Sequence, residues 1–248
     1  MLKAVLIKGG DQQFVDFKNF NFSGLKGQTK PSRKGLHFYS SRVTLVISSP
    51  NRQFIDYLLY NLMKITRVEV GSMIITPEKV ELESIDGVGK KDKFICLSPL
   101  VLLEPQIMNE ESKLFIDPET DEFSDHLYDN TMQRLEDIES FSPKQLEKFK
   151  EFQLVPDKAY LDKINQSHKK FSRVYPVYDQ DVKFEVRGYT FPFNLYAEPE
   201  VKRFVFLNGL GAATHKGFGM IDFANLDPNE RVELYDVPDI MAADYNPN

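Results

Sequence analysis

The order of strand-like and helix-like segments constrains the fold of this chain most. A helix is expected over residues 54–62, where apolar residues recur at spacings of three and four and would form one face. Ser49 or Asn51 is expected to cap it. The segments around it alternate apolar and polar residues or are rich in β-branched and aromatic ones, and they are 17–23, 36–48, 68–70, 73–82 and 94–103. This order, with strands on both sides of one helix, predicts an α+β domain, with a glycine-rich and basic loop at residues 24–35.

The second half of the chain is expected to combine strands and helices in the same way. Predicted elements are helices at 125–138 and 143–152, one or two strands within 182–197, a helix opened by Pro199, and a strand at 218–223. Each half therefore offers strands with one or two helices, as in two α+β sandwiches. The last 25 residues are acidic and contain three prolines, so an extended arm or a partly disordered tail is expected there.

Charge is distributed unevenly along the chain. The formal net charge of −6 argues, taken alone, against a nucleic-acid partner. However, residues 17–55 hold seven Lys or Arg and no acid, and residues 163–216 hold nine basic residues against five acids. Because salt screens charges beyond about 10 Å, a phosphate group feels nearby cations more than a distant net charge. A solvated loop beside an edge strand would explain the first basic stretch equally well, and both interpretations stay open.

A glycine-rich stretch follows the helix that Pro199 opens. Residues 209–219 read G-L-G-A-A-T-H-K-G-F-G, which permits close approach of the backbone to a ligand, and His215 and Lys216 lie inside it. The stretch is neither a Walker A loop nor a dinucleotide fingerprint, because the spacing and the helix-to-strand context differ from both. A tight turn that needs positive φ angles is the alternative interpretation.

The spacing of these glycines resembles a known superfamily. After a helix near the C-terminus, the chain has the pattern Gly-apolar-Gly, five residues, Gly-apolar-Gly. This pattern is similar to the glycine-rich loop of the RAMP superfamily of CRISPR-associated proteins. Three further stretches resemble the repeat-processing endoribonuclease family within it, in the family's order: residues 17–23, residues 48–62 and the L-S-P-L segment at 97–100. The matches extend over residues 17–223.

The resemblance implies two tandem ferredoxin-like domains, each close to an RNA-recognition-motif fold. We expect them at residues 1–104 and 105–223, followed by an acidic tail at 224–248. It also implies an endoribonuclease that binds CRISPR repeat RNA and cleaves precursor crRNA. The cut would be metal-independent: the 2′-hydroxyl attacks the adjacent phosphate and leaves a cyclic phosphate and a 5′-hydroxyl, with no cofactor.

The site residues expected from this resemblance lie in the two basic stretches. Family members commonly carry a catalytic histidine before the first matched strand, and residues 1–16 contain none. Because histidine titrates near neutrality, His37 becomes the expected base, with Tyr39 and Lys34 beside it. An ordinary strand residue is the alternative for His37, whereas His126 and His168 are expected on the surface. The residues expected to bind RNA are Lys26, Lys30, Arg33, Gly209, Gly211, His215, Lys216, Gly217 and Gly219.

Two further hypotheses stay open from the sequence. A non-catalytic RNA-binding RAMP protein, or a subunit of a CRISPR effector complex, would bind the repeat without cutting it. A structural adaptor would instead dock a basic partner on its acidic stretch at residues 104–162 and on its acidic tail. The single cysteine, Cys96, excludes an intramolecular disulfide and fits a reducing cytoplasm. We found no signal peptide and no apolar run long enough to span a bilayer, so a cytoplasmic protein is expected.

Overall fold

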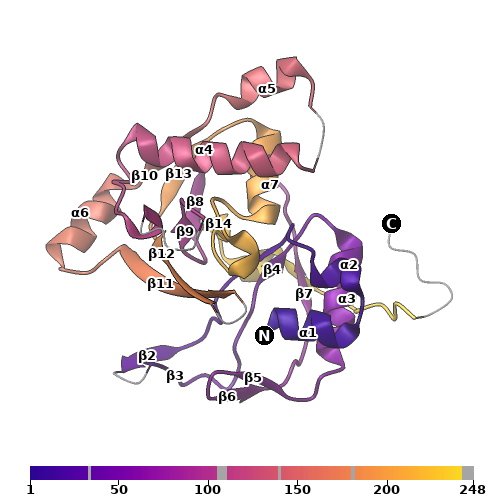
Figure 1. Cartoon of the computed structure of the whole chain (residues 1–248). Coiled ribbons are helices and arrows are strands. Elements are labelled where there is room, and N and C mark those ends of the chain that lie inside the picture. Colours follow the sequence, from indigo (N-terminus) through magenta and orange to yellow (C-terminus); the bar gives the residue numbers. More distant parts are fainter. Residues whose placement is uncertain (33–34, 105–110, 139–140, 180–181, 242–248) are drawn as a thin grey trace. The chain divides into compact units, whose positions relative to one another are not determined.

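The computed structural model describes residues 1–32, 35–104, 111–138, 141–179 and 182–241 (Figure 1). Helices and small antiparallel sheets are mixed along the chain. The chain forms two compact units. The small unit comprises Met1–Asn19, Ser49–Asp86 and Asn225–Asn248, and the large unit comprises Phe20–Ser48 and Gly87–Ala224. The domain boundaries expected from the sequence, 1–104 and 105–223, differ from the boundaries of these two units and stay a prediction. None of the described helices is long and apolar enough to cross a membrane.

The small unit is built on the amphipathic helix expected from the sequence. Its elements are α1 Leu2–Gly9, α2 Gln12–Val15, α3 Arg52–Met63, β5 Val68–Val70, β6 Met73–Ile75, β7 Glu81–Glu83, η4 Pro228–Arg231 and β15 Val232–Leu234. Asn51 caps α3, because its side chain accepts the N–H of Phe54 at 2.9 Å. The apolar face of α3 packs on aromatic residues, with the rings of Phe14 and Tyr57 4.7 Å apart. The helix and the cap by Asn51 are therefore confirmed.

The C-terminal stretch is part of the small unit as far as residue 241. β15 pairs antiparallel with β7, with Val232 opposite Glu83. The Tyr235 hydroxyl donates to the buried carboxylate of Asp56 at 2.5 Å, and Arg52 donates to both groups. Burial, together with the bond to Asp56, raises the pKa of Tyr235 to about 12. This stretch is thus anchored by backbone pairing and by a charged cluster.

The large unit holds the remaining strands and helices. Its strands are β1 Asn21–Phe22, β2 Thr29–Ser32, β3 Gly35–Phe38, β4 Ile47–Ser48, β8 Lys93–Cys96, β9 Leu100–Val101, β10 Gln153–Pro156, β11 Ser172–Asp179, β12 Val182–Tyr189, β13 Phe193–Tyr196 and β14 Ile221–Phe223. Its helices are α4 Asp121–Glu136, α5 Pro143–Phe149, α6 Lys158–Gln166 and α7 Pro199–Asn208, and its short 3-10 turns are η1 Val88–Lys90, η2 Glu111–Lys113 and η3 Thr214–Lys216.

Two sheets organise the core of the large unit. One has the strand order β10-β13-β8-β14 and the other β11-β12-β9. The fully buried Phe94 of β8 lies about 6 Å from the rings of Phe193 and Phe223, so aromatic packing holds the first sheet together. The glycine-rich loop packs along β9, because Ala212 donates to the Val101 carbonyl at 2.7 Å.

Several expected elements differ from the observed ones. The loop expected at 24–35 contains β2, which pairs with β3, and the run expected at 94–103 is divided into β8 and β9 at the Ser-Pro step. The helices expected at 125–138 and 143–152 are confirmed as α4 and α5. The sequence pattern missed β10, α6 and β11. α6 is short and mostly exposed, with Leu161 its only buried residue, so its apolar stripe spans little more than one turn.

Candidate nucleic-acid interface

The basic stretch after the first strand forms an exposed hairpin of β2 and β3 (Figure 1). Lys30 lies directly opposite His37 in the register, and Tyr39 donates its N–H to the Gln28 carbonyl at 2.8 Å. Cross-strand partners and residues two apart share one face of a sheet, so Lys30, His37 and Tyr39 lie on the same face. Tyr39 is 65% exposed, which leaves its ring accessible for stacking.

The hairpin brings part of the expected catalytic group together. His37 is exposed, and its side chain has no hydrogen bond or ion pair with another described residue. Arg33, expected to bind RNA, and Lys34, expected to assist catalysis, lie outside the described residues. Lys26 is half-buried at an isolated bridge to Thr44. The structure therefore places a histidine, a lysine and an aromatic ring on one accessible surface.

The glycine-rich loop is packed against the large unit's own backbone. Leu210 donates to the Gly219 carbonyl, and Gly219 donates to Pro99, both at 2.8 Å. Gly211 has a φ of +87°, and a Cβ there would lie 2.4 Å from the Val101 oxygen. At Gly219 (φ +73°) a Cβ would lie 2.2 Å from the Leu210 oxygen. Positive φ angles and close packing within the protein explain why glycine is needed at these positions.

Exposure differs along the glycine-rich loop. Gly209, Gly211 and Gly219 are buried, whereas His215, Lys216 and Gly217 are half-buried at its turn η3. RNA contact by all six stays a prediction. The half-buried residues of η3 are the ones whose side chains or backbone reach the surface.

Arg134, which sequence analysis did not single out, holds the start of this loop. Its Nη1 donates to the Asn208 carbonyl at 3.0 Å and to Thr214 Oγ1 at 3.2 Å, and its Nη2 donates to the Gly209 carbonyl at 2.6 Å. The residue is half-buried overall, and burial of its guanidinium lowers the pKa of Arg134 to about 10. The Arg134 guanidinium also lies 5.4 Å from the centre of the Phe204 ring.

A second charged residue outside the expected set holds the middle of the loop. Glu104, which follows β9, accepts the backbone N–H of Ala213 through its Oε1 at 2.9 Å. Both Glu104 and Arg134 belong to the acidic stretch 104–162. The one available sequence signal was that Arg134 is the only Lys or Arg of a sixteen-residue acidic helix.

The second basic stretch exposes cations at the junction of α6 and β11. Lys163, Lys169, Lys170 and Arg173 are exposed, and none forms an ion pair with a described residue. His168 lies between them with a left-handed backbone (φ +54°) and is exposed, as expected. His126 is half-buried on α4 and lies 3.8 Å from the Glu122 carboxylate.

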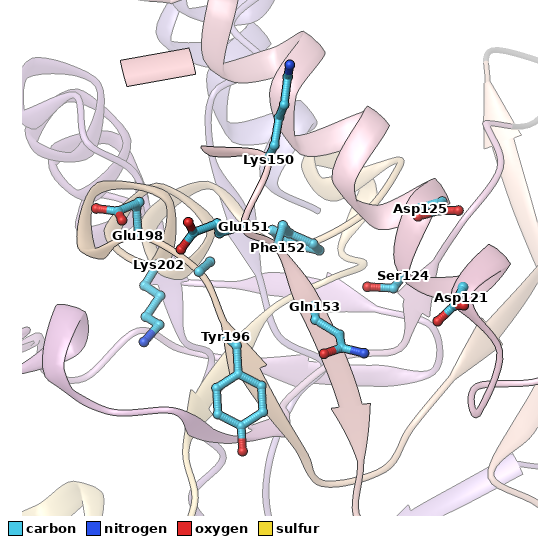
Figure 2. A pocket seen from close by; sticks show the side chains of 11 residues that line it. Asp121, Ser124, Asp125, Lys150, Glu151, Phe152, Gln153, Tyr196, Glu198 and Lys202 are labelled. Carbon is cyan, nitrogen blue, oxygen red and sulfur yellow. The ribbon is translucent and has the colours of Figure 1, made fainter. Parts of the chain in front are cut away.

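One cavity in the large unit, of about 530 Å³, is acidic (Figure 2). Its lining residues are Asp121, Ser124, Asp125, Lys150, Glu151, Phe152, Gln153, Tyr196, Ala197, Glu198 and Lys202. The Lys202 amine is bonded to Asp92, which does not line the cavity. Four carboxylates against two amines make this cavity unsuited to a phosphate. Within the described residues, no group of three or more His, Cys, Asp or Glu side chains is arranged to hold a metal ion.

Comparisons with known proteins agree with this architecture. Residues 82–223 match the family "CRISPR associated protein Cas6, C-terminal", which covers more than half of the chain. A relative from Pyrococcus horikoshii, named "Putative CRISPR-associated endoribonuclease-like protein Cas6nc", is 23% identical over 195 residues, covering 76% of this chain and 71% of the relative. The fold defines a RAMP-type protein, and the family match shows which family it belongs to. The chain belongs to the Cas6 family of CRISPR-associated proteins.

Solved structures show the same fold. A "CRISPR associated protein Cas6" has a TM-score of 0.66 and 19% identity, with 90% of this chain and 89% of that chain covered. "An RAMP protein binding different RNA substrates" has a TM-score of 0.61 and 22% identity, with coverage of 90% and 87%. These similarities confirm the expected RAMP-type fold of tandem ferredoxin-like domains.

Proposed function

We propose that this chain binds CRISPR repeat RNA and cleaves precursor crRNA without a metal ion. The observation that carries the proposal is the shared face of Lys30, His37 and Tyr39 on the β2–β3 hairpin. A general base, a cation beside the phosphate and a general acid for the leaving oxygen are the groups that this cleavage requires. Membership of the Cas6 family supports CRISPR repeat RNA as the substrate, and the accessible face of the hairpin supports its cleavage.

The proposed reaction divides among the three side chains. The His37 imidazole takes the proton from a ribose 2′-hydroxyl, whose oxygen then attacks the adjacent phosphorus. The bond from phosphorus to the 5′-oxygen breaks, leaving a 2′,3′-cyclic phosphate on one product. Lys30 stabilises the negative charge that develops on the phosphate oxygens, and the Tyr39 hydroxyl protonates the departing 5′-oxygen. The second product then carries a 5′-hydroxyl.

A second candidate function is repeat binding without cleavage. Two observations favour it: α1 and α2 contain no histidine, and no described side chain orients the His37 imidazole. Histidine bases are usually oriented by a hydrogen bond at the second ring nitrogen. Such a protein would hold the repeat or join an effector complex.

The test incubates the full chain with labelled repeat RNA in EDTA and, separately, with the same RNA carrying a 2′-deoxy group at each candidate cut site. We expect cyclic-phosphate products from the first RNA and binding without cleavage of the second. His37→Ala should slow cleavage at least about 100-fold, which is the ordinary contribution of a general base, with little change in affinity. His168→Ala is the matched control and should leave the rate unchanged.

The two candidates separate in the same experiment. Salt-sensitive binding without any product would reject cleavage and favour the non-catalytic function. An unchanged rate for His37→Ala would remove His37 as the base. No affinity for the repeat, even at low salt, would contradict both candidates and favour an adaptor.

A further inference from the structure

The glycine-rich loop is held by two charged side chains just before the residues proposed to meet RNA. We propose that Arg134 and Glu104, together the loop clamp, are positioning residues that set the turn η3 and thereby orient His215 and Lys216. The inference rests on the proposed function, because it names the residues that prepare the same loop for RNA. It adds a role for the acidic stretch, which supplies both members of the clamp.

The Arg134 guanidinium suits this task because of its shape. The carbonyl oxygens of Asn208 and Gly209 end α7, where helix acceptors lack partners within the helix. Arg134 reaches both of them and the Thr214 hydroxyl from one planar group. A lysine has a single amine on a flexible chain, so it cannot reproduce three directed bonds over this span. Arg134 therefore joins the end of α7 to the first residue of η3.

Arg134 acts within the protein rather than on RNA. Its Nη1 and Nη2 donate to the loop, and its Nε lies 3.4 Å from the Asn130 carbonyl of its own helix. All three nitrogens are thus directed at protein acceptors. Burial lowers the pKa of Arg134, and the negative charge of the nearby Glu104 carboxylate acts in the other direction and raises it. The four bonds of Arg134 use four of the five N–H donors of the guanidinium, so at most one is left for a phosphate.

Glu104 holds the most strained residue of the loop. Ala213 has a φ of +54°, in the left-handed region that residues other than glycine adopt at a cost. The Glu104 carboxylate accepts the Ala213 N–H, a charge-assisted bond that stabilises this conformation. The Ala213 carbonyl in turn accepts the N–H of Lys216 at 2.9 Å. The conformation at Ala213 is therefore transmitted directly to the residue that carries the proposed RNA contact.

A double-mutant cycle tests the clamp. Affinity for the 2′-deoxy repeat RNA is measured by fluorescence anisotropy for wild type, Arg134→Lys, Glu104→Ala, the pair His215→Ala/Lys216→Ala, and each clamp variant combined with that pair. We expect each clamp variant to weaken binding about tenfold in the wild-type background. In the background lacking both side chains of η3, it should change affinity less than twofold, because the clamp acts through them. Arg203→Lys, an exposed position on α7, is the matched control and should have no effect.

The outcomes separate the clamp from a general structural role and from the proposed function. Equal losses in both backgrounds, or no loss in a folded clamp variant, would overturn the clamp. Should Arg134→Lys fail to fold, Glu104→Ala decides by the same cycle. Wild-type protein with no affinity for the repeat would overturn the proposed function and the orientation toward RNA together, whereas wild-type binding with additive losses overturns the clamp alone.

Discussion

At the scale of single residues, the glycines of the loop and the charged residues around it have different roles. Gly211 and Gly219 satisfy the protein's own packing, whereas Arg134 holds the backbone before them at Gly209 and Glu104 holds the backbone between them at Ala213. The glycine spacing was visible in the sequence because these residues are close together along the chain. The clamp was not, since Arg134 is 75 residues from the carbonyl that it binds at Gly209.

The first prediction concerns Gly211. Gly211→Ala should lower the free energy of unfolding by about 2 kcal/mol or more, because an L side chain at a positive φ is strained and its Cβ would press on the Val101 carbonyl. Chemical denaturation measures the loss. Gly24→Ala is the control, because nothing lies within 4 Å of a Cβ at that position, and it should be close to neutral. A stable Gly211→Ala variant would contradict the close contact.

At the scale of elements, local periodicity identified α3, α4 and α5 but not β11 or α6. α3 is amphipathic and capped by Asn51, so its signal lies within one short window. β11 is defined by pairing with β12 across eight residue pairs, and Pro176 in the middle of its sequence S-R-V-Y-P-V-Y-D weakens the strand signal of the Val and Tyr residues around it. β2 was hidden in a stretch rich in glycine, proline and basic residues, whereas β3 lies at the start of the run expected at 36–48.

The second prediction concerns the β2–β3 hairpin and the residues between its strands. Changing Lys30, Arg33 and Lys34 together to Ala should weaken repeat binding and reduce the slope of log K against log salt, by roughly 0.7 for each lost phosphate contact. Anisotropy titrations at several salt concentrations measure this slope. Lys144→Ala/Lys148→Ala/Lys150→Ala removes the same charge from the acidic stretch and should leave the slope unchanged. Equal slopes for the two triple variants would show that only net charge matters.

At the scale of the whole molecule, the chain is organised into two units that are discontinuous in sequence. The small unit combines the first 19 residues, a middle segment and the C-terminal stretch, and Tyr235 with Asp56 is one of its long-range contacts. The net charge of the whole chain was a poor guide to its partner, because the basic and acidic stretches are separate. What matters for an RNA partner is which charges share a surface.

The third prediction concerns the anchor at Tyr235. Tyr235→Phe should lower the free energy of unfolding by about 1–3 kcal/mol at neutral pH, because buried Asp56 loses a hydrogen-bond donor. The pKa of Tyr235 is raised to about 12 in the folded protein, so its contribution is present below the ordinary tyrosine pKa of about 10 and is lost as the pH rises through 12. Thermal unfolding between pH 7 and 11 should therefore show wild type and variant converging. Tyr39→Phe, an exposed position, should not differ from wild type at neutral pH, and parallel curves for Tyr235→Phe would contradict the shifted pKa.

The sequence by itself determined the local features: the amphipathic helices, the uneven charge, the glycine-rich loop and the resemblance that they carry. These depend on neighbours within a few residues, and periodicity and composition report on such neighbours directly. The tertiary structure alone decided that His37 faces Lys30, that the loop packs on Val101, and that Arg134 and Glu104 hold it. Strand pairing and buried polar contacts join residues tens of positions apart, and no local pattern specifies which distant partner will satisfy them.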